Sequence, residues 1–195
     1  MSKQAKFDRD DVIEKAKNLY WQKGYHATSM RNLQDVVDMR PGSIYAAFGS
    51  KDNLFKEALN RYAEEGAEQL ASCMMQERSV LAGLKRFMRR VVIDHQDSAP
   101  SGMCMIVKTV AELTQADSPE LLADATRILA GIEASFIRLF QQAIDNGEIQ
   151  ADKSPAKLAR YLQVQLIGLR TYAQIHNNMT AIESFIDDVF EGLLL

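Results

Sequence analysis

The chain has 195 residues, of which 47% are hydrophobic and 25% are charged, a balance that is typical of a globular protein with one or two small domains. Its two cysteines, Cys73 and Cys104, are too few for a disulfide framework, so we expect a reducing, cytoplasmic compartment. Because no apolar run approaches the ~18 residues of a membrane span and the N-terminus is polar, we expect neither a membrane segment nor a signal peptide.

The net charge of −3 is divided unevenly along the chain. Residues 1–61 carry 11 Lys and Arg against 8 Asp and Glu, a net of +3, whereas residues 62–195 carry 12 against 18, a net of −6. A modest basic excess near the N-terminus indicates a nucleic-acid contact there, and tight binding would need two copies side by side.

Apolar residues recur at intervals of three and four, which predicts an all-α fold of about nine helices. The first helix is expected from Asp8 to Gly24, because acidic residues in its first turn suit the positive end of the helix dipole. A short helix over 30–37, a turn over 38–40 and a second short helix from Pro41 to Phe48 follow. A helix this short buries little by itself, so this arrangement indicates a helix-turn-helix whose second helix reads DNA.

The remaining two thirds of the chain also predict helices. Ser50 is expected to cap a long helix that has no breaker between a DNA-binding domain over 1–55 and a second domain over 56–195, and Thr180 is expected to cap the last helix. The other predicted helices cover 79–95, 103–113, 119–146 and 155–176.

Several short motifs strengthen the helix-turn-helix interpretation. They are Lys23-Gly24-Tyr25, Thr28-Ser29, Gly42-Ser43-Ile44-Tyr45, Phe48 and Ser50-Lys51. In this order they resemble the DNA-binding domain of the TetR family of bacterial repressors over about residues 7–59. The resemblance implies a homodimeric repressor on a palindromic DNA operator. The family's usual turn has Gly, a hydrophobe and Ser, whereas this chain has Asp38, Met39 and Arg40; Asp tolerates the left-handed conformation.

The residues predicted to contact DNA lie on and beside the two short helices. Arg40 is the candidate for bidentate recognition of guanine, and its alternative role is a solvated turn residue. Thr28 and Ser29 could hold a phosphate or could cap the helix that follows. The resemblance implies that Tyr45 and Lys51 contact the DNA backbone. The predicted set is Thr28, Ser29, Arg31, Arg40, Pro41, Gly42, Ser43, Tyr45 and Lys51.

The segment 79–146 holds many flexible and aromatic apolar side chains. Methionine adapts to irregular cavities, but ordinary core packing explains the same composition. The resemblance implies a cavity for a small-molecule inducer, which we expect to be apolar. The predicted lining is Phe87, Met88, Met103, Cys104, Met105, Phe136 and Phe140.

Cys104 lies in the string Ser101-Gly102-Met103-Cys104-Met105-Ile106-Val107-Lys108. This string resembles a segment of TetR-family members that sense electrophiles and oxidants, with one extra residue before the cysteine. A place in the first turn of a helix, with Lys108 on the same face, would favour the thiolate. The alternative is a small buried core cysteine.

The last two helices present broad apolar faces. These faces can be covered within the chain or by a second copy, and the resemblance implies the second arrangement. The predicted interface is Leu162, Gln165, Leu169, Tyr172, Phe185, Ile186, Val189 and Phe190.

We expect no metal, cofactor or catalytic site. His26, His95 and His176 show no metal-ligand spacing, and no nucleotide-binding or nucleophile motif is present. The alternative to a DNA-binding regulator is a helical module that binds a ligand or a protein without a role on DNA. An enzyme ranks last.

Overall fold

The structure is a computed structural model that describes residues 7–94, 99–176 and 178–194. These residues form nine α-helices, one π-helical turn and no strand, which confirms the predicted all-α class. In chain order the elements are α1 (Arg9–Lys23), α2 (Met30–Val37), α3 (Pro41–Phe48), α4 (Lys51–Gln76), α5 (Val80–Arg89), a π-helical turn (Arg90–Asp94), α6 (Met105–Glu112), α7 (Pro119–Asp145), α8 (Pro155–Ile175) and α9 (Met179–Leu194).

Local signals set the ends of the N-terminal helices. The Asp8 carboxylate accepts hydrogen bonds from the amides of Asp10 and Asp11, and Gly24, at φ 88°, ends α1. Asp38 adopts the left-handed conformation, with φ 52° and ψ 46°, and ends α2 as its sequence allows. Ser50 caps α4 by accepting a 3.0 Å hydrogen bond from the amide of Asn53.

Three predicted boundaries were wrong. Helix α9 begins at Met179 rather than after Thr180, because the side-chain oxygen of Asn178 accepts the amide of Ala181 at 3.2 Å. Helix α6 begins at Met105, two residues later than predicted. The predicted helix 79–95 divides into α5 and the π-helical turn, and His95 lies outside the described residues.

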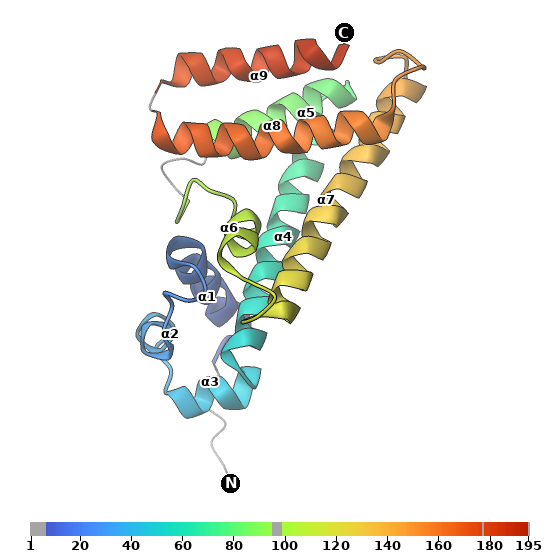
Figure 1. Cartoon of the computed structure of the whole chain (residues 1–195). Helices are drawn as coiled ribbons and strands as arrows, with labels where there is room; N and C mark the ends of the chain where they lie inside the picture. The colour runs from blue at the N-terminus through green and yellow to red at the C-terminus, as the bar shows by residue number, and fades with distance from the viewer. Residues whose placement is uncertain (1–6, 95–98, 177, 195) are drawn as a thin grey trace.

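The helices form a small unit and a larger bundle that share α4 and α7 (Figure 1). Helices α1–α3, which we call the head, pack at one end of α4, while α5, α8 and α9 cross at the other end. Helix α6 lies between the head and α8. Head residues such as Leu33 and Phe48 share one buried cluster with Met105 of α6 and Leu121 of α7. The head therefore packs directly against the rest of the chain.

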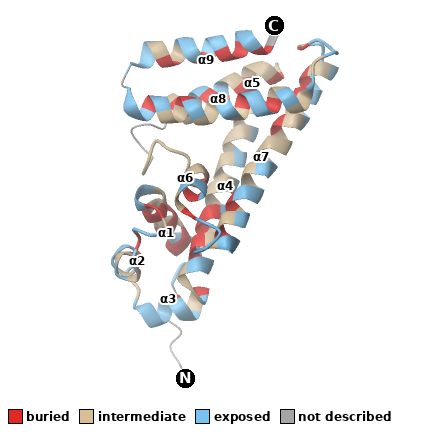
Figure 2. Ribbon diagram, viewed as in Figure 1, coloured by how far each residue is buried: buried red, intermediate tan, exposed pale blue. Residues whose placement is uncertain are grey.

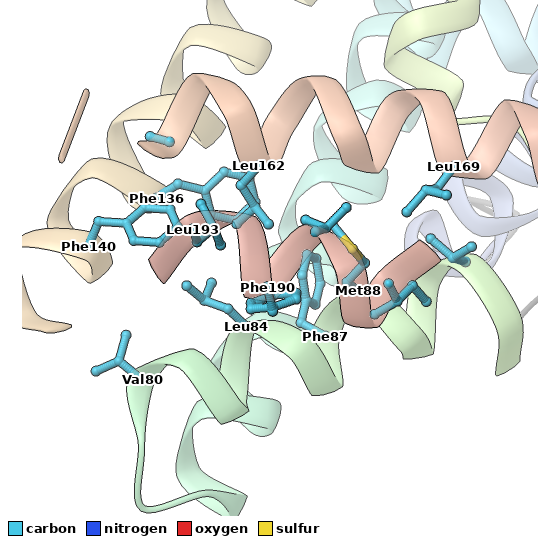
Figure 3. Packing of buried hydrophobic residues seen from close by; sticks show 14 of the residues in the cluster. Val80, Leu84, Phe87, Met88, Phe136, Phe140, Leu162, Leu169, Phe190 and Leu193 are labelled. Atoms are coloured by element: carbon cyan, nitrogen blue, oxygen red, sulfur yellow. The ribbon is translucent and has the colours of Figure 1, made fainter. Parts of the chain in front are cut away.

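A second buried cluster lies where α5, α7, α8 and α9 meet (Figure 3). It includes Met88 and Phe140, which pack in this core and do not line the cavity described below, where we had predicted them. It also includes residues that we predicted at an interface between two copies. Their side chains fill the core of their own subunit because both helices turn those faces inward; they are Leu162, Leu169, Ile186, Val189 and Phe190.

Glu148 ties the loop after α7 to the start of α5. Its carboxylate accepts hydrogen bonds from the hydroxyl of Ser79 at 2.6 Å and from the amides of Val80 at 2.9 Å and Leu81 at 3.0 Å. Partial burial alone would raise the pKa of Glu148, but these hydrogen bonds lower it below the ordinary value.

The lowered pKa makes a prediction about acid stability. Ionised Glu148 stabilises the fold above its unfolded pKa, and this contribution is lost as the pH falls through the lower folded pKa. We expect Glu148→Gln to reduce the free energy of unfolding at pH 7 and to have a smaller effect near pH ~3, because a larger fraction of the Glu148 carboxylate is protonated there. Urea unfolding at the two pH values, with Glu191→Gln at an exposed position as control, measures this. An equal loss at both pH values would contradict the assignment.

Candidate nucleic-acid interface and sensor cavity

Much of α3 in the head is exposed (Figure 2). Ile44 and Phe48 are buried and anchor the helix, while the residues at its start and on its outer face are exposed. Five members of the predicted DNA-contacting set lie on this exposed surface, and they are Arg40, Pro41, Gly42, Ser43 and Tyr45. The start of α3 is therefore accessible, as a helix that enters the major groove must be.

Arg40 occupies the N-cap position of α3 in an extended conformation, with φ −70° and ψ 150°. Its carbonyl accepts the amides of Ser43 at 2.9 Å and Ile44 at 3.2 Å. The guanidinium makes no hydrogen bond or ion pair with any residue that the structure describes. An unpaired, exposed guanidinium at the start of this helix can meet a base edge or a phosphate.

Thr28 is misplaced in the predicted set. It is fully buried, and its hydroxyl donates a 2.6 Å hydrogen bond to the carbonyl of Gly24. The hydroxyl therefore stabilises the turn after α1. Ser29 is exposed but serves as the N-cap of α2, since its hydroxyl oxygen accepts the amide of Asn32 at 3.1 Å. Of the two alternatives for this pair, the structure places Ser29 in the capping role.

Lys51 has a structural role that the sequence did not indicate. Its ammonium group donates a 2.7 Å hydrogen bond to the carbonyl of Tyr25 and lies 4.1 Å from the centre of the Tyr25 ring. Partial burial lowers the pKa of Lys51. The hydrogen bond to Tyr25 holds the α1–α2 loop against the start of α4, and a DNA contact of Lys51 stays a prediction. Arg31 is exposed on α2, and Ala46, which we did not predict, is exposed beside Tyr45.

Helix α6 is hydrogen-bonded to the chain on both sides of Gly24, where α1 ends. The ammonium group of Lys108 donates to the carbonyls of Trp21 at 2.6 Å and Gln22 at 3.1 Å. The Glu112 carboxylate accepts the amides of Tyr25 at 2.9 Å and His26 at 2.6 Å. Opposite charges one turn apart on α6 thus hold the carbonyls at the end of α1 and the amides just beyond it. No local sequence signal marks these contacts, because the partners lie more than 80 residues apart.

A cavity of about 650 Å³ lies between α1, α4, α5 with its π-helical turn, α7, α8 and the start of α6 with the segment before it. A volume of this size suits a small organic ligand. Its walls are largely apolar and aromatic, with a few charged groups. Its lining includes Trp21, Tyr62, Leu70, Phe87, Val91, Cys104, Ile106, Ile128, Phe136, Leu166 and Arg170.

The residues that line the cavity differ in part from the predicted ones. Of the predicted lining, Phe87, Cys104 and Phe136 line this cavity. Met105 is instead buried in the head cluster, and Met103 does not line the cavity; its carbonyl accepts the Trp21 indole N–H at 2.6 Å. The sequence did not indicate Trp21, Tyr62 and Arg170, since each lies on a different helix and only the fold brings them together.

Cys104 is partly exposed and lines the cavity, but it is not in the first turn of α6. It is the N-cap residue of α6 and makes no capping hydrogen bond with its side chain. Lys108, the predicted activating cation, is bound to the α1 carbonyls. The Tyr62 hydroxyl interacts with Cys104 and accepts a 3.0 Å hydrogen bond from Arg170. Burial raises the pKa of Tyr62, so the phenol stays neutral beside the thiol.

Family comparisons match this arrangement at both ends of the chain. The model for bacterial regulatory proteins of the tetR family matches residues 12–58, which include most of the head. The model for the tetracyclin repressor-like C-terminal domain matches residues 80–189, more than half of the chain. The chain belongs to the TetR family. It is a DNA-binding transcriptional regulator of the TetR type, as the helix-turn-helix motifs predicted.

The chain is also similar to individual TetR-type repressors in sequence and in structure. The repressor ComR of Escherichia coli K12 is 27% identical over 169 residues, covering 86% of this chain and 80% of ComR. The repressor BdcR of the same organism is 31% identical over 105 residues, about half of each chain. Among solved structures, a cysteine mutant of CifR superimposes with a TM-score of 0.87 at 25% identity, covering 97% of this chain and 98% of that one. Reduced NemR of E. coli has the same fold, with a TM-score of 0.80 at 19% identity over 96% of this chain and 97% of its own.

Two kinds of site are absent from the described part of this TetR-family chain. No three His, Cys, Asp or Glu side chains gather there in a way that could hold a metal ion. None of the helices in that part is long and apolar enough to cross a membrane.

Proposed function

We propose that this TetR-family regulator acts as a homodimer that binds a palindromic operator, inserts α3 of each subunit into the major groove and represses transcription until a small-molecule inducer releases it. The observation that carries the DNA role is the exposed start of α3. Ser43 and Tyr45 are exposed there, and the guanidinium of Arg40 has no partner among the described residues. The similar CifR mutant structure is a complex with 26-bp double-strand operator DNA, which supports this role. A regulator of chromosomal DNA would act in the cytoplasm.

Exposed apolar side chains on α8 and α9 support the dimer. Monomeric proteins rarely expose a contiguous apolar patch of this kind. Gly168 adds room for close approach, because a Cβ placed there would meet no atom of the described chain within 4 Å. Of the predicted interface, Tyr172 and Phe185 are exposed and Gln165 is partly exposed. The proposed contact surface is Tyr161, Val164, Gln165, Gly168, Tyr172, Ile175 and Phe185.

The cavity and α6 offer a path from the inducer to DNA. Cys104 and Ile106 line the cavity at the start of α6, while Lys108 and Glu112 of the same helix hold the α1–α2 junction. A ligand that displaces α6 would move the head against its partner and change the spacing of the two α3 helices. Modification of Cys104 by an oxidant or electrophile is the alternative trigger. Under that alternative, Cys104→Ser stops oxidant-driven release.

Salt dependence of binding tests the DNA role. Fluorescence anisotropy with DNA from upstream of the regulated genes, measured between about 50 and 200 mM salt, should show a steep linear fall of log K with log salt, because phosphate contacts release counterions. Affinity for a scrambled duplex should be lower by a factor of roughly 10³ or more. Weak binding without preference for either duplex would favour a ligand- or protein-binding module without a role on DNA.

A further inference from the structure

The cavity contains a guanidinium that lacks a counterion. Arg170 projects from α8 into the lining, and no carboxylate of the described residues lies within 4.0 Å of its nitrogens. Lys56, by comparison, pairs with Glu120 of a neighbouring helix at 2.8 Å. A partly buried cation in an apolar cavity loses hydration, and an anion would compensate for that loss.

The hydrogen bonds of Arg170 leave donors free. Its Nε donates to the carbonyl of Gly102 at 3.1 Å, and one Nη1 hydrogen goes to the hydroxyl of Tyr62 at 3.0 Å. A guanidinium has five N–H donors, so the second Nη1 hydrogen and both Nη2 hydrogens have no partner among the described residues. The two bonds that are made fix the plane of the group. A fixed guanidinium with a free edge matches the two oxygens of a carboxylate.

The other charged groups of the lining, Lys17, Glu14 and Glu65, are hydrogen-bonded to one another. Lys17, only 3% exposed, donates to Glu14 at 2.7 Å and to both Glu65 oxygens at 2.6 Å. These two carboxylates are partly exposed and surround one ammonium group, so they leave a surplus negative charge on the α1–α4 wall. That surplus would favour a cationic ligand, and a test must separate the two cases.

We propose that the cavity takes an amphipathic organic anion, whose carboxylate binds the free edge of the Arg170 guanidinium and whose aromatic or aliphatic body lies against Trp21, Phe87 and Phe136. The proposal rests on the proposed function, since it names the chemical class of the inducer. It replaces the purely apolar inducer that the sequence predicted. Burial of the apolar body supplies affinity, and the charge-assisted hydrogen bonds supply selectivity.

Three matched probes with one hydrophobic body test the charge preference. They are 6-phenylhexanoate, 6-phenylhexanamide and 6-phenylhexylamine. Trp21 is the only tryptophan of the chain and lines the cavity, so its fluorescence reports binding without DNA. A charge-assisted hydrogen bond contributes enough for the carboxylate to bind roughly 10- to 100-fold more tightly than the amide. Calorimetry on the full chain confirms the stoichiometry.

Variants assign the preference to one residue. Arg170→Met should reduce the carboxylate-to-amide ratio to about 1, whereas Arg160→Met is the matched control. Arg160 lies on the same helix, is 66% exposed and pairs with Glu133 at 3.0 Å, outside the cavity. In Gly131→Leu, the new side chain should fill the cavity and abolish binding of all three probes. A Cβ at Gly131 meets no atom of the described chain within 4 Å, so this variant should fold even if Arg170→Met does not.

Equal binding of the acid and the amide, a preference for the amine, or no binding of any probe by the wild-type protein would each overturn the proposal. A ratio that persists in Arg170→Met would do the same. None of these readouts involves DNA. If operator affinity falls steeply with salt but the carboxylate probe binds no more tightly than the amide, the proposed function is retained and only this inference is lost.

Discussion

Arg40→Ala is expected to weaken operator binding by roughly 10²- to 10⁴-fold. One arginine contact to a guanine edge contributes about 1–3 kcal/mol of discrimination, and a two-fold dimer loses the contact in both subunits. The exposed guanidinium has no partner among the described residues, so its removal should leave the stability of the head unchanged. Fluorescence anisotropy at fixed salt measures the affinity, and urea unfolding measures the stability.

Arg127→Ala is the matched control for Arg40→Ala. Arg127 is also an exposed arginine, with 73% of its side chain accessible, but it lies on α7, outside α1–α3, and pairs with Asp124 of the same helix. Both variants lose one positive charge per subunit, so a general electrostatic effect would weaken both equally. If operator affinity is the same for the two variants, Arg40 does not contact the DNA and the assignment is wrong.

Val164→Asp is expected to convert the proposed dimer into folded monomers and, with that, to abolish tight operator binding. Val164 is 65% exposed on α8 in this single chain, so a carboxylate there costs nothing in the monomer. In a two-fold interface it would bury two unpaired carboxylates, and the desolvation of each costs several kcal/mol. We expect the dimer dissociation constant to rise by at least ~10³-fold. Sedimentation equilibrium measures it.

Two further substitutions are controls for the Val164→Asp experiment. Val164→Thr keeps the shape of the side chain and should leave the dimer intact. Ile186→Asp changes a residue that is fully buried in the subunit, so it should unfold the chain rather than separate two copies. A Val164→Asp protein that remains dimeric would show that this face of α8 is not the interface.

The positions of the helices could largely be predicted because their signals are local. Periodic apolar residues, the caps at Asp8 and Ser50 and the left-handed Asp38 each act within a few residues, and each is in place in the structure. Thr180 shows the limit of such signals. Asn178, two residues earlier, offers an equally good side-chain oxygen, and sequence alone does not choose between them.

The faces of the helices were harder to predict than the helices themselves. A run of apolar residues on α8 and α9 shows that these helices pack, but it does not say against what. Leu162 and Ile186 proved to face the subunit's own core, while Val164 and Ile175 face outward. Likewise the hydroxyl of Thr28 could have bound a phosphate, and only the structure shows that Thr28 is buried and donates to the carbonyl of Gly24.

The sequence by itself determined the all-α class and the helix-turn-helix head, because caps, turns and helical periodicity are encoded within a few neighbouring residues, and the resemblance of its motifs to the TetR family indicated a regulator. Only the tertiary structure decided which side chains share a space. Trp21, Cys104 and Arg170 meet at one cavity, and Lys108 and Glu112 reach across to the end of α1. Such contacts join residues far apart in the chain, so their energies depend on how helices pack rather than on any local pattern.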